Sequence, residues 1–111
     1  MRERLEWVER DGAWWVDLDA AGGGRYLVAR PAPEPGWFVP AFVVDPGEAE
    51  REIGEGQPDL ASAQEMATKV AIQALARIHG VSPAPGRPEP DAPEGERLIA
   101  ALWDLLARTV Q

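Results

Sequence analysis

Few residues of this chain have the type and spacing that chemistry requires. Asp17 and Asp19 stand at alternate positions of an expected strand, so their carboxylates share a face and could bind a cation or flank a substrate. Acids at alternate positions are also common on solvated strands, and we favour that interpretation. His79 is the only histidine, in the last turn of an expected helix, where a cation interacts favourably with the helix carbonyls. The sequence therefore predicts no catalytic residue.

Two further motifs point away from cofactor chemistry. Gly22, Gly23 and Gly24 precede an expected strand, whereas a phosphate-binding loop leads from a strand into a helix, so we interpret the triplet as a hairpin loop. The chain has no cysteine, which excludes disulfides and thiolate chemistry. We expect no cofactor, no metal site and no enzymatic activity.

The charge balance limits the possible partners. Acidic residues outnumber basic ones by 19 to 11, and the segment 45–65 carries seven acids against the single base Arg51. Such a surface repels nucleic acid and anionic membranes, so we expect neither as a partner. The segment is either a solvated loop or a patch for a basic protein. Residues 1–10 lack the continuous apolar run of a signal peptide, and we expect a cytoplasmic protein.

The first half of the chain has the pattern of a β-meander. Alternating apolar residues predict strands over 4–9, 13–19, 25–30 and 37–44. Asp11 and Gly12 between the first two are typical of a tight hairpin, because both tolerate positive φ angles. Pro40 lies inside the fourth strand and cannot donate a ladder hydrogen bond, which predicts an edge strand or a bulge there.

The second half predicts two helices and a connector. The first helix spans 62–79, with Ser62 and Glu65 as a capping box and Gly80 as its stop. Its apolar stripe includes Ala67, Ala71 and Ile78. The segment 82–95 is rich in proline and acid, and is expected to be an extended linker. An amphipathic helix over 96–111 follows.

Together these patterns predict an α+β fold in three parts: a core domain over 1–81, a Pro-rich acidic linker over 82–95 and a C-terminal helix over 96–111. The core is a four-stranded antiparallel meander with one helix packed on a face.

Trp14 and Trp15 are neighbours in an extended strand, so they point to opposite faces of the sheet. We expect Trp14, Val16 and Leu18 to face the first helix. Trp15 then needs a second cover, which the C-terminal helix of this chain or of a partner could supply. We favour exchange between two copies, because an extended Pro-rich connector does not force the helix back onto its own sheet. The predicted interface residues are Trp15, Leu98, Leu102, Trp103, Leu105 and Leu106.

One stretch of the chain is similar to a known family. Residues 37–40, the glycines Gly54 and Gly56, and residues 60–67 resemble the strand, glycine turn and helix of HicB-type antitoxin domains. The resemblance covers under a third of the chain and implies an acidic domain that neutralises a toxin.

Three functional hypotheses follow. The leading one is a non-enzymatic interaction or assembly module that binds itself as a homodimer, or another protein, through the C-terminal helix and the outer sheet face. The alternative is an acidic inhibitor or antitoxin-like protein that binds a basic partner through residues 45–65. The third is an enzyme or ligand binder that uses Asp17, Asp19 and the aromatic side chains.

Overall fold

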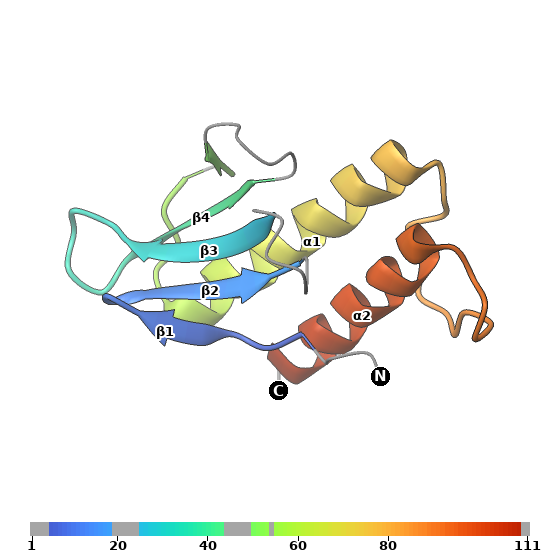
Figure 1. The fold of residues 1–111 in the computed structure, drawn as a ribbon. Helices are drawn as coiled ribbons and strands as arrows, with labels where there is room; N and C mark the ends of the chain where they lie inside the picture. Colours follow the sequence, from blue (N-terminus) through green and yellow to red (C-terminus); the bar gives the residue numbers. More distant parts are fainter. Residues whose placement is uncertain (1–4, 19–24, 44–49, 54, 110–111) are drawn as a thin grey trace.

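A computed structural model describes residues 5–18, 25–43, 50–53 and 55–109 of the chain. It shows one antiparallel sheet of five strands in chain order and two helices (Figure 1). The strands are β1 (Val8–Arg10), β2 (Ala13–Asp17), β3 (Tyr26–Pro31), β4 (Phe38–Val43) and β5 (Arg51–Glu52). The helices are α1 (Leu60–His79) and α2 (Glu94–Thr109). The predicted α+β class and antiparallel meander are confirmed, and β5 extends the four predicted strands.

The β1–β2 hairpin closes as its sequence predicts. Arg10 pairs with Ala13, which leaves Asp11 and Gly12 as a two-residue turn. Both turn residues have positive φ, 54° for Asp11 and 83° for Gly12. Such a turn matches the twist of the flanking strands, so it fixes the register in which Val8 lies opposite Trp15.

Pro40 lies in an inner strand, so the expectation of an edge strand is wrong. It pairs with Ala29 of β3, and β5 lies on the other side of β4. The Pro40 carbonyl accepts a hydrogen bond from the N–H of Ile53, just beyond β5. The N and C=O of one residue in an antiparallel strand point toward the same neighbouring strand. The nitrogen of Pro40, which carries no hydrogen, therefore points toward the end of β5 and not toward β3. The proline therefore removes no hydrogen bond between β3 and β4.

Helix α1 begins two residues before the predicted start. Its N-cap is Asp59, whose carboxylate accepts a hydrogen bond from the N–H of Ser62 at 2.7 Å. The predicted capping box on Ser62 is wrong, because an acidic side chain three residues earlier already satisfies this orphan donor. Gly80 ends the helix in the left-handed conformation, as predicted. Ile78 is more than half exposed and does not belong to the buried stripe.

Both helices cover the same face of the sheet. Figure 1 shows α1 passing behind the strands, with α2 beside it. One core joins Val16 and Leu27 of the sheet to both helices, through residues that include Ile72 and Leu75 of α1 and Leu102 of α2. Small buried alanines of α1, among them Ala67 and Ala71, permit the close approach of the helix to the strands. Val16 and Leu18 pack in this core, as predicted, whereas Trp14, the third residue expected there, is half-buried and is not part of the core cluster.

The segment between the helices folds back on α2. The indole N–H of Trp103 donates a hydrogen bond of 2.7 Å to the carbonyl of Pro83, and Ala92 is buried. Helix α2 begins at Glu94, inside the range predicted as a linker. The connector is therefore packed against the helix that it precedes, and α2 shares its core with α1 and the sheet.

Candidate interaction surface

In the part of the chain that the structure describes, no helix lies over the other face of the sheet, and we call it the helix-free face. Strand alternation and the pairing register assign to it Val8, Arg10, Ala13, Trp15, Asp17, Tyr26, Val28, Arg30, Val39, Ala41, Val43 and Glu52. At its centre Val28 and Ala41 are 0% and 1% exposed. Among the described residues, Trp15 and Tyr26 pack on this buried centre.

The aromatic cover comes from Trp15 and Tyr26. They pack on the small cluster of Ala13, Val28 and Ala41. The two rings lie with centroids 4.9 Å apart at an angle of 54°. The Trp15 indole N–H reaches back to the carbonyl of Arg10 at 3.4 Å. Two aromatic rings thus form a tilted pair over the centre of the face, a favoured aromatic geometry.

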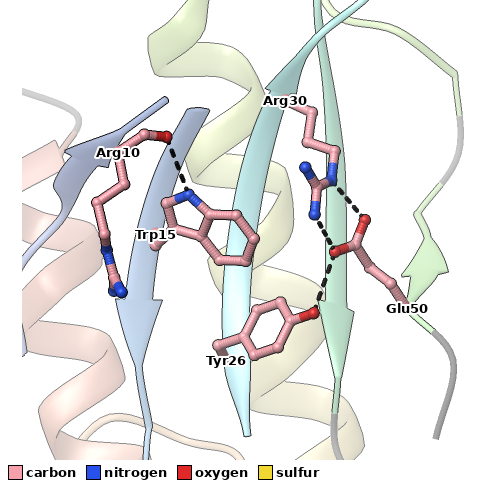
Figure 2. A network of polar contacts seen from close by, with 5 residues as sticks. All are labelled: Arg10, Trp15, Tyr26, Arg30 and Glu50. Carbon is pink, nitrogen blue, oxygen red and sulfur yellow. Dashed lines mark hydrogen bonds and ion pairs between the residues drawn. The ribbon is translucent and has the colours of Figure 1, made fainter. Parts of the chain in front are cut away.

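An ion pair completes this cover (Figure 2). Nε and Nη2 of Arg30 each donate a hydrogen bond of 2.7 Å to the carboxylate of Glu50. The hydroxyl of Tyr26 donates a third, at 3.2 Å. Glu50 precedes β5 and so reaches across β4 to two residues of β3. Bidentate pairs of this kind are stronger than a single surface contact because their geometry is fixed.

The pKa values follow from this arrangement. Hydrogen bonds from Arg30 hold the pKa of Glu50 below its ordinary value. The pKa of Tyr26 is raised, first by burial and then by the negative charge of Glu50. Glu50 is therefore ionised and Tyr26 is a neutral donor at neutral pH.

Two guanidinium groups lie near the ring of Trp15. The Cζ atom of Arg30 is 4.8 Å from the ring centroid, and that of Arg10 is 5.8 Å away. Both distances are within the range of cation–π attraction. Arg10 also approaches Asp17 at 3.5 Å, in a loose pair whose side chains are 56% and 67% exposed.

The edges of the helix-free face expose apolar side chains. Val8, beside Trp15, is 49% exposed, and Trp37 is 40% exposed. Trp37 and Val39 both lie beside Gly56, and Val39 pairs with Arg30. Apolar surface therefore flanks the charged and aromatic centre at both edges of the sheet.

The structure separates the predicted interface residues. Trp15 lies on the helix-free face, whereas Leu98, Leu102, Leu105 and Leu106 are buried on the other side of the sheet. Trp103 is half-buried, packs on the same core and is hydrogen-bonded to Pro83. The C-terminal helix of the same chain does not cover Trp15, because its apolar arc packs beside α1. Cover by the C-terminal helix of a second copy, which the sequence favours, stays a prediction.

The remaining candidates give no second site in the described part of the chain. Asp17 faces Arg10, while Asp19 and the glycines 22–24 lie outside the described residues. No cluster of potential metal ligands is found among the residues that the structure describes. His79 lies against Gly95 at the start of α2. A hollow between the connector and α2 is lined by residues that include Ser82, Arg87 and Glu96, and the hydroxyl of Ser82 accepts a hydrogen bond from the N–H of Ala84.

Part of the acidic segment 45–65 lies outside the described residues, namely 45–49 and 54. Three of its acids have partners within the chain: Glu50 binds Arg30, Asp59 caps α1 and Glu65 pairs with Lys69. Binding of a basic protein through this segment stays a prediction.

Sequence reasoning missed Tyr26, Arg30 and Glu50. Alternation along β2 and β3 places Trp15, Tyr26 and Arg30 on one face, so two of the three could have been found. The position of Glu50 could not, because it depends on how the chain returns after β4.

No family model, no curated protein and no solved structure matches the chain. The similarity to HicB-type antitoxin domains therefore rests on the quoted residues alone. No helix in the described part of the chain is long and apolar enough to cross a membrane.

Proposed function

We propose that the chain is a small non-enzymatic protein-interaction module, and that its helix-free face is the contact surface. The observation that carries this proposal is the composition of the face. It brings together Trp15, Tyr26, Arg10 and Arg30, and Trp, Tyr and Arg are the residue types that dominate binding energy at protein interfaces.

The arrangement supports contact with a protein better than catalysis. The aromatic rings are held in place by the Arg30–Glu50 pair, so they present a fixed surface. Preorganised groups lose little conformational entropy on binding. The apolar edges at Val8 and Trp37 add surface whose burial is favourable.

The other face makes a poorer candidate because its apolar side chains are already covered by the helices. We propose that the module acts in the cytoplasm, since the chain uses no disulfide for its stability.

A site-specific photo-crosslinker tests the proposal. A photoreactive phenylalanine analogue at Val8 places the probe on the exposed edge of the helix-free face. The same analogue at Gln73, on the exposed side of α1, is the control. In the native cell, Val8 should give a discrete protein adduct that Trp15→Ala weakens. Equal labelling from both positions, or none from Val8, contradicts the proposal.

A further inference from the structure

Strand β1 lies at one edge of the sheet, and the outer side of this strand is open (Figure 1). No described strand pairs with that side, and Val8, Glu9 and Arg10 are all exposed. The strand contains no proline and pairs with β2 without a bulge, so it lacks two of the usual devices that prevent an edge from binding another chain. Its outward backbone groups are therefore available to a further strand.

The hairpin turn decides which backbone groups of β1 point outward. A two-residue turn makes the flanking residues, Arg10 and Ala13, a pair that exchanges both backbone hydrogen bonds. The N–H and C=O of Arg10 therefore point inward, to β2. Because this pattern alternates along an antiparallel strand, the N–H and C=O of Glu9 point outward and those of Val8 point inward.

The same alternation continues into the residues before β1. Leu5 and Trp7 pack on the core under the helices, whereas Glu6 between them is exposed. An extended chain gives this pattern, since its side chains alternate between the two faces. The N–H and C=O of Trp7 therefore belong to the outer side, and they form no backbone hydrogen bond with a described residue. Glu9 and Trp7 thus offer donors and acceptors along one edge.

The residues along this edge restrict how two such edges can pair. An antiparallel register centred on Glu9 or on Arg10 places that charged side chain opposite its own counterpart, and like charges in this position destabilise a strand pair. A register centred on Trp7 requires the carbonyl of Leu5, which already accepts a hydrogen bond of 2.6 Å from Arg108. The register centred on the residue between Glu9 and Trp7 avoids both conflicts.

We infer that the outer edge of β1 binds a second copy of this chain in an antiparallel pair, with Val8 of each copy at the two-fold axis. In this register the N–H and C=O of Glu9 bind the C=O and N–H of Trp7 in the other copy. Glu6 of each copy lies opposite Arg10 of the other. The contact is isologous and joins the two sheets into one. It goes beyond the proposed function, because it uses the backbone edge and not the aromatic surface.

Charge complementarity along the edge selects a second copy as the partner. Glu6 is exposed and makes no ion pair with a described residue, so it is available to the guanidinium of Arg10 across the axis. Arg10 has five N–H donors and makes only a loose contact of 3.5 Å with Asp17, which it need not release. Opposite charges directly across two strands stabilise the pair. Val8, 49% exposed in the single chain, is covered by its own counterpart.

Charge reversal on the full chain tests the register. Glu6→Arg changes the net charge from −8 to −6, and Arg10→Glu changes it from −8 to −10. Each variant replaces two attractive cross-strand pairs by two repulsive ones, so each dimer should be about tenfold weaker or more. Net charge alone would instead make Glu6→Arg associate better. Mixing the two variants restores both pairs, so the mixture should form a heterodimer near the wild-type affinity.

A proline at position 9 tests the backbone contact. Glu9→Pro removes an N–H that points outward in the single chain, so the pairing of β1 with β2 keeps its hydrogen bonds, and prolines are tolerated at such edge positions. The dimer loses a hydrogen bond from each copy and should be about tenfold weaker or more. Glu9→Gln retains the N–H and should leave the affinity within about twofold of wild type.

Sedimentation equilibrium at about 0.15 M salt, where charges further apart than about 8 Å are screened, measures each affinity. Glu89→Arg, on the exposed connector, makes the same charge change as Glu6→Arg and should leave the wild-type affinity unchanged. Circular dichroism of each variant confirms folding independently of association.

A wild-type chain that stays monomeric at about 1 mM overturns the inference, as do folded charge variants that fail to pair when mixed. A folded Glu9→Pro chain that associates as tightly as wild type also overturns it. The photo-crosslink from Val8 separates this failure from that of the proposed function. An adduct with a different protein, from a chain that is monomeric, preserves the interaction module and removes the second copy as its partner. An adduct of two copies that Glu9→Pro abolishes supports the paired edge.

Discussion

The two faces of the sheet exclude water by different means. On one face, aliphatic side chains of the sheet pack against those of α1 and α2, with Leu27, Ile72 and Leu102 almost fully buried. On the helix-free face two aromatic rings pack on Val28 and Ala41, and the Arg30–Glu50 ion pair is hydrogen-bonded to one of them, Tyr26. Apolar packing depends on shape and volume, whereas the second cover depends on charge. The stability contributed by the first face should therefore depend on side-chain volume, and the stability contributed by the second face should depend on pH.

The largest effect is expected on the helix-covered face. Leu102→Ala should lower the free energy of unfolding by about 2–5 kcal/mol, because it removes a fully buried side chain from the core that joins α2 to α1. Urea denaturation measures the loss. Val8→Ala, on the exposed edge of the other face, should change stability by about 0.5 kcal/mol or less.

The same variant tests where α2 docks. If α2 packs on its own chain, the loss from Leu102→Ala should not vary with protein concentration. A loss that appears only at high concentration would show that α2 packs on a second copy, and would remove the contrast between the two faces.

A somewhat smaller effect is expected where the two helices meet. A Cβ atom on Gly95 would lie 2.6 Å from Cβ of His79, closer than two carbons can approach. Gly95→Ala should therefore destabilise the fold by about 1–3 kcal/mol, through displacement of the start of α2. Thermal unfolding measures it. Gly86→Ala is the matched control, since its added Cβ meets nothing within 4 Å. Equal changes in the unfolding temperature for both variants would show that the two helices can move apart to accommodate the added Cβ atom.

The sequence was sufficient for the first four strands and both helices because their signals are local, whereas the two-residue strand β5 was not predicted. The Asp11-Gly12 turn, Gly80 after α1 and the alternation through Val16 each act within a few residues. The N-cap was misassigned because Asp59 and Ser62 are both good caps, and only the backbone at Asp59 decides between them.

The position of α2 could not be predicted from its sequence. Its apolar arc requires burial, but the pattern does not say against which face. The Pro-rich composition of the connector indicates an extended chain, and the hydrogen bond from Trp103 to Pro83 that folds it back depends on residues twenty positions apart. The candidate site shows the same limit. The position of Trp15 on a sheet face follows from the alternation of side chains along its strand. The position of Glu50 follows from its contact with Arg30 across β4, which the sequence does not show.

The smallest effect is expected on the helix-free face, and it should depend on pH. Glu50→Gln removes the charge that Arg30 and Tyr26 bind, and should lower the free energy of unfolding by about 1 kcal/mol at pH 7. The pKa of Glu50 lies below its ordinary value of 4.5 in the folded chain, so the unfolded chain binds the proton first as the pH falls. The stability contributed by Glu50 is thus complete above pH 4.5 and is lost as the pH falls through the folded pKa. Urea denaturation at pH 7 and below pH 4 should show the two proteins converging in acid. Glu65→Gln, which breaks only the exposed pair with Lys69, should cost about 0.5 kcal/mol or less at pH 7. A Glu50→Gln deficit that persists undiminished in acid would mean that the helix-free face is held by packing, as the other face is.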